Sequence, residues 1–345
     1  MKVGKIPDGM DSIDAKKKVS SFLRTIQNDS KPDKCILCGQ PKTSFCNSHS
    51  VPRMCLKNIA VDGKVLQANG LIGVDIIDVE KGVNNSGTFH FICNECDSKL
   101  FRNYENPDGW TEETPTDRVL AQIALKDVLL MLSKRNLETL LWQRAAEMSS
   151  IGGMDYMKTV QELDIRDFTD EMELYKGITT ETKEQFKIVF YEKLPYTVPI
   201  ATQVAFVLDK DFEGNVINDI FNISADVRIQ NLHLSIFPLK GSTVVIVFYH
   251  RRDKNYRRFH HQFNCLSHDK KVEYINYWIF KYTENYFFSP RIKTLLEEDE
   301  KLQLLSQENY GVSNLGYVLG LEDLLYEEVK SSEVTNLLGE SCRLL

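Results

Sequence analysis

The most regular apolar spacing in the chain falls in residues 117–148, where apolar side chains recur every three or four positions. This spacing places them on one face of a helix, so we predict a long helical stretch, with a break near 133–136. A weaker, acidic helix is predicted from about 154 to 182, which gives a helical region over 117–182. Charged residues between the apolar positions are expected on the solvated side: Arg118, Lys126, Lys134 and Arg135.

A different pattern covers residues 186–250. Four runs rich in Val, Ile, Phe and Tyr are separated by turn residues, which predicts strands. Lys240-Gly241 joins the last two runs too tightly for a crossover helix, so we predict antiparallel pairing. Helices are expected again at about 268–286 and 290–306. These elements make a mixed β then α domain over 186–345.

The first part of the chain has weaker patterns. Residues 1–34 predict an N-terminal helix or arm, with the apolar residues Val19, Phe22, Leu23 and Ile26 on one side. Residues 56–91 predict short strands, and Asp62-Gly63 between two apolar segments predicts a hairpin turn. The polar stretch 106–117 is expected to connect this part to the helical region.

Composition places the chain among ordinary globular proteins. Of its 345 residues, 42% are apolar and 26% are charged, which suits two or three domains. No apolar run approaches the ~20 residues of a membrane span, and the N-terminus lacks the apolar core of a signal peptide, so we expect a cytoplasmic protein without a membrane partner. The net charge of −7 argues against a surface coated for nucleic acid, although a local basic surface remains compatible with it.

Four of the eight cysteines form two Cys-x-x-Cys pairs, Cys35/Cys38 and Cys93/Cys96. In a reducing compartment thiolates are free to bind metal, and two such pairs can close one tetrahedral zinc site. A second arrangement uses Cys35 and Cys38 with Cys46 and His49, which have Cys-x-x-His spacing, and buried free thiols are a third interpretation. The chain contains no Walker loop, Rossmann glycine fingerprint, G-x-S-x-G elbow or H-E-x-x-H motif.

Three segments together resemble the zinc-bound form of the HNH, or ββα-metal, endonuclease family. The family pattern is C-x-x-C, then D-H-[IV]-x-P, then an Asn, then L-C-x-x-C-[NH]-x-x-K. The resemblance covers residues 35–101 and implies a zinc treble clef over 35–105 that cleaves DNA or RNA, in a setting such as restriction, mobile elements or phage defence. The matching segments are Cys35-Ile-Leu-Cys38, Ser48-His49-Ser50-Val51-Pro52 and Ile92-Cys93-Asn94-Glu95-Cys96-Asp97-Ser98-Lys99.

The resemblance also implies roles for single residues. His49 corresponds to the general base, and Asp97, after the last cysteine, corresponds to a ligand of catalytic Mg²⁺ or Mn²⁺. The family's other carboxylate ligand is replaced by Ser48, so Ser48 or Asn47 would complete the metal site. The family's middle Asn has three candidates by position: Asn84, Asn85 and Thr88.

A basic segment lies far from the cysteines. Residues 249–261 place five cations among aromatic residues, which suits phosphate contact with Tyr256 stacking on a base; a solvated hairpin tip is the other interpretation. The cations are Arg251, Arg252, Lys254, Arg257 and Arg258.

The predicted fold is α+β, with an N-terminal zinc treble clef, a helical middle and a C-terminal antiparallel sheet with flanking helices. A rival function is a non-catalytic zinc module that binds nucleic acid or protein, with recognition by the C-terminal domain. A protein partner or a homo-oligomer is compatible with the sequence.

Overall fold

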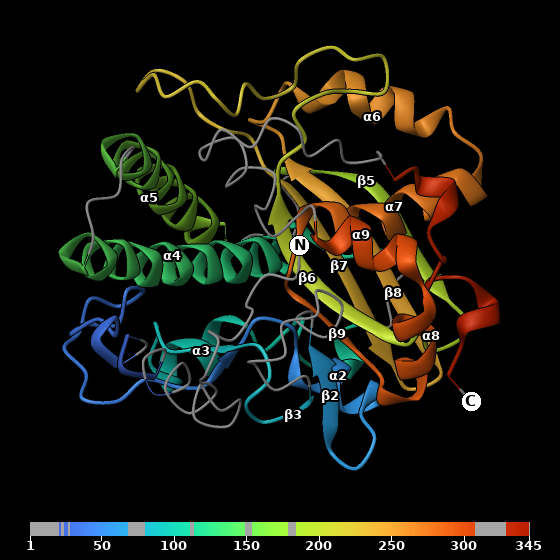
Figure 1. The fold of residues 1–345 in the computed structure, drawn as a ribbon, viewed down its shortest axis with the longest axis horizontal. Coiled ribbons are helices and arrows are strands. Elements are labelled where there is room, and N and C mark those ends of the chain that lie inside the picture. The colour runs from blue at the N-terminus through green and yellow to red at the C-terminus, as the bar shows by residue number, and fades with distance from the viewer. Residues whose placement is uncertain are drawn as a thin grey trace, which may run out of the picture.

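The protein is an α+β structure built on a seven-stranded antiparallel sheet (Figure 1). The computed structural model describes Ser21 and residues 24–26, 28–67, 80–110, 114–148, 154–178, 184–307 and 329–344. Across the sheet the strands follow the order β3-β2-β9-β6-β7-β8-β5, and every neighbouring pair is antiparallel. Their bounds are Lys64–Gln67 (β2), Glu80–Gly82 (β3), Phe186–Leu194 (β5), Ile200–Phe206 (β6), Leu232–Leu239 (β7), Ser242–His250 (β8) and Tyr286–Phe288 (β9).

The central strands confirm the strand prediction. Every residue of β6 and β7 is buried, as are all of β8 after its first residue. A strand covered on both faces is expected to be largely apolar, and the exceptions in β6 and β7 are the buried polar residues Thr202, Gln203, His233 and Ser235. Gly241, at φ +75°, closes the β7–β8 hairpin at the predicted Lys240-Gly241 turn.

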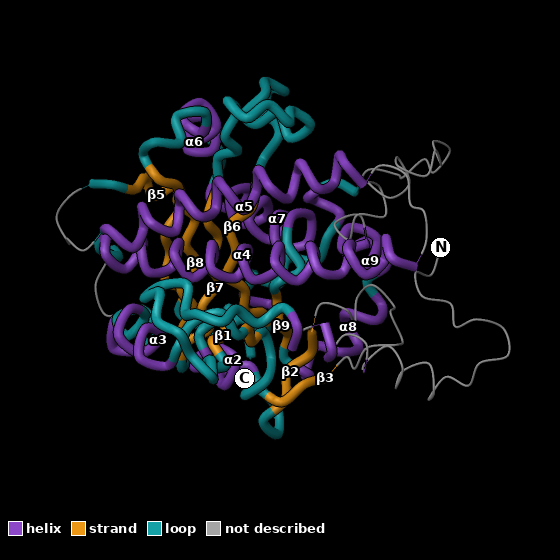
Figure 2. The backbone as a smooth tube through the Cα atoms, turned by 90° about the vertical axis from the view of Figure 1, so that its left-hand side faces the viewer, coloured by secondary structure: helices purple, strands orange, loops and turns teal. Residues whose placement is uncertain are grey.

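Helices cover both faces of the sheet. On one face lie α4 (Asp117–Met148) and α5 (Met154–Gly177), packed side by side (Figure 2). The other face carries α6 (Tyr256–Asn264), α7 (His268–Tyr282), α8 (Lys293–Glu298) and α9 (Glu300–Gln307). Helix α4 runs through residues 133–136 without the predicted break. Among the described helices, none is long and apolar enough to cross a membrane.

The cysteine-bearing segment is joined to the sheet through its insert. Strand β2 pairs with β9, in the register Leu66 to Phe288, so residues between the two cysteine pairs extend the distal sheet. Helix α2 (Arg53–Ile59) packs on β6 and β7, and Asn58 Nδ2 donates to the carbonyl of Pro238 at 2.9 Å. The described residues between Cys35 and Trp110 and the sheet therefore share one packed core.

Two predicted segments differ from the structure. Helix α2 takes in residues 56–59, where the predicted strands were to begin, because Pro52 precedes its first turn and Cys55, Leu56 and Ile59 bury one helical face. The Asp62-Gly63 turn is confirmed, with φ values of 50° and 72°.

The predicted basic tip is a short turn followed by α6, which buries Tyr256, Phe259 and Phe263 at helical spacing. Most of the predicted N-terminal helix lies outside the described residues.

Gly87 lies where the insert returns to the cysteine module. Its φ is +62°, and an added Cβ would meet Phe287 Cζ at 2.5 Å and Ser50 Oγ at 2.7 Å. Gly87→Ala is therefore expected to lower the free energy of unfolding by roughly 2–5 kcal/mol, from left-handed strain plus overpacking. Gly241→Ala is the matched control, because φ is similar and nothing lies within 4 Å of its Cβ. Its expected loss is ~1–2 kcal/mol. Equal losses in urea unfolding would contradict the packing argument.

Candidate metal centre and adjoining polar site

The structure brings the two cysteine pairs together. One ligand atom from each of Cys35, Cys38, Cys93 and Cys96 lies within 4.8 Å of all the others. Gly39, at φ +68°, lets the chain turn back after the first pair, and its N–H donates to the carbonyl of Cys35 at 2.8 Å. The second pair begins helix α3 (Asn94–Leu100), where Cys93 is the N-cap residue.

The geometry of these four thiols suits a metal ion. A tetrahedral zinc site with Zn–S bonds of ~2.3 Å separates its sulfurs by about 3.8 Å, which is compatible with the observed cluster. The pKa of Cys35 is lowered to about 7: burial raises it, but the backbone N–H groups of Cys38, Cys93 and Leu37 outweigh that effect. The four cysteines could therefore hold a metal such as zinc.

Cys46 does not join this cluster. Its Sγ donates to the carbonyl of Ile92 at 3.2 Å, and burial raises its pKa to about 12. Of the two arrangements considered from the sequence, the structure assembles the one made of the two Cys-x-x-Cys pairs.

A short hairpin precedes the second cysteine pair. Strand β1 (Ser48–His49) pairs antiparallel with β4 (Thr88–Phe89), and the chain then enters α3. The pair of strands is thus followed by a helix, and the cysteine cluster lies at the N-terminus of that helix. His49 stands opposite Thr88 in this register, so Thr88 is the candidate for the middle position that lies directly across the hairpin. Asn84 instead accepts from the side chain of Arg53.

His49 is half-buried and oriented by the backbone. Its Nε2 lies 3.0 Å from the carbonyl oxygen of Val83. A carbonyl can only accept, so Nε2 carries the proton and, in the neutral ring, the lone pair is on Nδ1. Burial lowers the pKa of His49, and the positive charges of Lys126 and Arg53 lower it further, against the Val83 bond and Asp97, which raise it.

Ser48 and Asp97, the two positions that the resemblance assigns to a catalytic metal, are both bound to Lys126. Ser48 Oγ donates to Asp97 Oδ1 at 2.7 Å, and Lys126 Nζ donates to these atoms at 2.9 and 2.8 Å. Glu105 Oε1 lies 3.0 Å from the same nitrogen. The Lys126 side chain has no solvent exposure, so the prediction that it lies on the solvated side of α4 is wrong.

These residues do not fit a divalent ion as they stand. Mg²⁺ takes about six oxygen ligands at ~2.0–2.1 Å, several of them water. Here a buried ammonium group already contacts Asp97 and Ser48, and Ser48 is fully buried. The remaining candidate, Asn47, accepts a hydrogen bond from His90 Nε2 at its Oδ1, over 2.6 Å, and is not part of this cluster.

The basic segment near residue 250 is largely neutralised by carboxylates. Arg251 pairs with Glu184, Arg252 with Glu171, and Arg258 with Asp211 and Glu213. Lys254 and Arg257 are exposed. Tyr256 is fully buried and its hydroxyl donates to the carbonyl of Gln230 at 3.0 Å, so the idea that it stacks on a base is wrong. Phosphate contact by the five cations stays a prediction.

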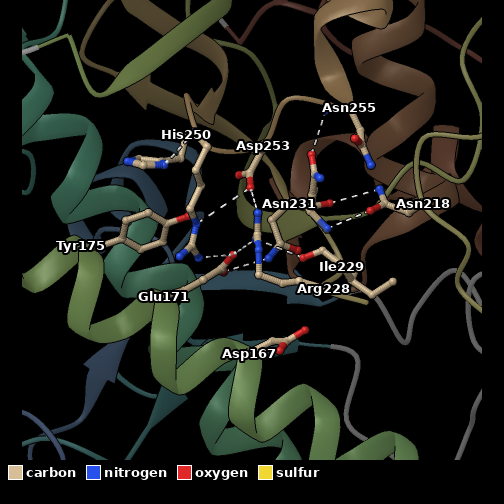
Figure 3. Close-up of polar contacts among 12 residues, drawn as sticks. Asp167, Glu171, Tyr175, Asn218, Arg228, Ile229, Asn231, His250, Asp253 and Asn255 are labelled. Atoms are coloured by element: carbon tan, nitrogen blue, oxygen red, sulfur yellow. Dashed lines mark hydrogen bonds and ion pairs between the residues drawn. The ribbon is translucent and has the colours of Figure 1, made fainter. Parts of the chain in front are cut away.

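A second polar cluster, which sequence reasoning missed, lies between α5 and the end of β8 (Figure 3). Glu171, 1% exposed, accepts from Arg228 at 3.2 Å and from Arg252 at 3.1 Å. Asp253, fully buried, also pairs with Arg228. The partners come from positions far apart in the sequence, and each alone resembles an ordinary surface charge. Only the folded chain brings them together.

His250 lies at the edge of this cluster, 5% exposed, with its ring against Tyr175 and Phe186. Burial, reinforced by the positive charges of Arg252, His233 and Arg228, lowers its pKa from 6.5 to about 4. The imidazole therefore binds protons more weakly in the folded than in the unfolded chain.

This difference predicts a pH dependence of stability. Between pH 6.5 and 4 the unfolded state takes up the proton first, so the free energy of unfolding falls as pH is lowered, by up to about 3 kcal/mol from this group. His250→Gln should show a correspondingly weaker fall when urea unfolding is measured across this range. His261→Gln, which changes an exposed histidine, should follow the wild type. Identical pH profiles for all three proteins would contradict the assignment.

Comparison of the chain with protein-family models, with curated proteins and with solved structures finds no match in any of the three.

Proposed function

We propose that residues 35–105 form an HNH-like nuclease module in which His49 is the general base for hydrolysis of nucleic-acid phosphodiesters. The observation that carries this proposal is the His49–Val83 contact at 3.0 Å, which fixes the imidazole with its lone pair on Nδ1. The lowered pKa keeps that lone pair available at neutral pH. A neutral, positioned imidazole is what a general base requires.

The proposed step is hydrolysis of one P–O bond. His49 Nδ1 takes a proton from a water molecule as the water oxygen attacks phosphorus. The bond from phosphorus to the leaving sugar oxygen then breaks, and that oxygen takes a proton from solvent. The imidazolium returns its proton to water, so the base is regenerated.

Arg53 supports this proposal as a phosphate contact. It is exposed at the start of α2, and its charge acts on the His49 imidazole. Asn84 Oδ1 accepts from its Nε and Nη2. A guanidinium group has five N–H donors in a planar fork, so donors remain for a phosphate oxygen. DNA and RNA both present this backbone, and a role in defence or in mobile elements follows from the resemblance alone.

Zinc in the Cys35, Cys38, Cys93 and Cys96 cluster is proposed to be structural. A closed set of four thiolates leaves no open position for substrate, as in structural zinc sites. Bound there, zinc would tie the turn at residues 35–38 to the start of α3, which carries Asp97 directly after Cys96.

A second candidate is a non-catalytic zinc module that binds nucleic acid or protein. The observation that favours it is Ser48, which stands where the resembled family has a carboxylate and is fully buried against Asp97 and Lys126. In this case the same fold would supply only a binding surface, with recognition by the C-terminal part.

The zinc assignment predicts one zinc ion per chain by elemental analysis. Cys93→Ser should lose the metal and lower the melting temperature by roughly 5–10 °C, equivalent to a few kcal/mol. Cys46→Ser is the control and should retain the metal, because its Sγ donates to Ile92 and lies outside the cluster. Loss of zinc in Cys46→Ser with retention in Cys93→Ser would favour the other ligand set.

The nuclease assignment predicts cleavage of plasmid DNA or of RNA by the purified protein. His49→Ala should reduce the rate by roughly 10²–10⁴-fold, the contribution typical of a general base. His90→Ala, which changes a histidine on the same module bonded to Asn47, should cleave at the wild-type rate.

Binding to the same nucleic acids is followed in parallel by fluorescence anisotropy. Cleavage that persists in His49→Ala would remove the base role from His49. Binding without cleavage, with or without added Mg²⁺ or Mn²⁺, would favour the non-catalytic module.

A further inference from the structure

We infer that Lys126 is the resident cation of the HNH-like site, and that its ammonium group keeps a divalent ion from binding Asp97 and Ser48. This inference deepens the proposed function and depends on it for the identity of the site. The negative charge of Asp97 and Glu105 is then balanced by a side chain of helix α4 in place of a metal ion.

The contacts of Lys126 use its full hydrogen-bonding capacity. An ammonium group has three N–H donors and no acceptor. Three oxygens lie around Nζ: Asp97 Oδ1 at 2.8 Å, Ser48 Oγ at 2.9 Å and Glu105 Oε1 at 3.0 Å. Each donor therefore has a partner, and the oxygens are spaced for hydrogen bonds to nitrogen, not for the ~2.0–2.1 Å bonds of Mg²⁺.

Phe101 closes the site on another side. Its ring centroid lies 3.8 Å from Lys126 Nζ, and the ring is fully buried. The face of an aromatic ring attracts a cation but offers no oxygen lone pair. The ring therefore stabilises an ammonium group at this position, whereas a divalent ion would take its ligands and waters from the exposed side of Asp97 and Glu105 once the ammonium is removed.

Charge leads to the same assignment. Asp97 and Glu105 are 21% and 29% exposed, whereas the lysine side chain between them has no exposure. A divalent ion bound to Asp97 would lie within a few ångströms of a buried positive charge that cannot turn out to solvent without breaking its three contacts. Ion and ammonium therefore exclude each other.

The test is Mn²⁺ binding, measured from the EPR signal of the free ion, to zinc-loaded protein. Wild type and Lys126→Arg should leave that signal unchanged up to ~1 mM Mn²⁺, near the weak end of oxygen-ligand sites. Lys126→Met should bind one equivalent, because Asp97, Glu105 and Ser48 lose their cation. Mn²⁺ should also raise the melting temperature of this variant alone.

Binding of one Mn²⁺ by wild type that Asp97→Asn abolishes would overturn the inference. A folded Lys126→Met that binds no Mn²⁺ would overturn it as well. If Lys126→Met does not fold, Mn²⁺ binding by wild type and by Asp97→Asn decides alone. The zinc content of Asp97→Asn then checks that the substitution leaves the neighbouring Cys96 and its cluster intact.

Cleavage assays separate this inference from the proposed function. Wild-type cleavage without added divalent ions supports both. Cleavage that requires Mg²⁺ keeps the nuclease proposal and overturns the role of Lys126. Absence of cleavage together with absence of Mn²⁺ binding overturns the nuclease proposal and supports the assignment of Lys126.

Discussion

A buried ammonium group on helix α4 joins the cysteine module to the rest of the protein. Lys126 contacts Asp97 at the start of α3, Ser48 on the hairpin and Glu105 beyond α3, all within 3.0 Å. Desolvating a charge is costly, and removal of one partner from a buried pair typically costs about 3–5 kcal/mol. The arrangement of hairpin, helix and α4 therefore depends on these contacts being made together.

The next residue of the same helix faces the sheet. Asp127, 2% exposed, accepts from Gln203 Nε2 at 2.9 Å and lies 2.8 Å from His233 Nδ1. Adjacent helical positions point about 100° apart, so one turn of α4 contacts the cysteine module through Lys126 and strands β6 and β7 through Asp127. The module is also attached to the sheet directly, through β2 paired to β9 and through α2 packed on β6 and β7.

How far the sequence predicted the site depended on how local each signal is. The Cys-x-x-Cys pairs are local, and they were enough to name the four thiols that the structure places together. Strand β4, which precedes Cys93, also lies within the stretch where short strands were predicted. Lys126 was not, because a lysine between apolar helical positions reads as solvated until its surroundings are known. The prediction that Tyr256 stacks on a base was wrong for the same reason. Beside five cations it resembled a stacking residue, but its helical spacing with Phe259 and Phe263 places it in the core.

By itself the sequence determined the fold class and the antiparallel strands at 186–250, and it named the two cysteine pairs as candidates, because periodicity and short spacing act over a few residues. The tertiary structure decided which cation balances Asp97, which strand receives the insert, and how Glu171, Arg228, Arg252 and Asp253 neutralise one another. These outcomes depend on burial and on partners separated by tens to hundreds of positions. A charged side chain reads the same in sequence whether it faces water or closes a site; only packing removes the water and makes the pairing obligatory.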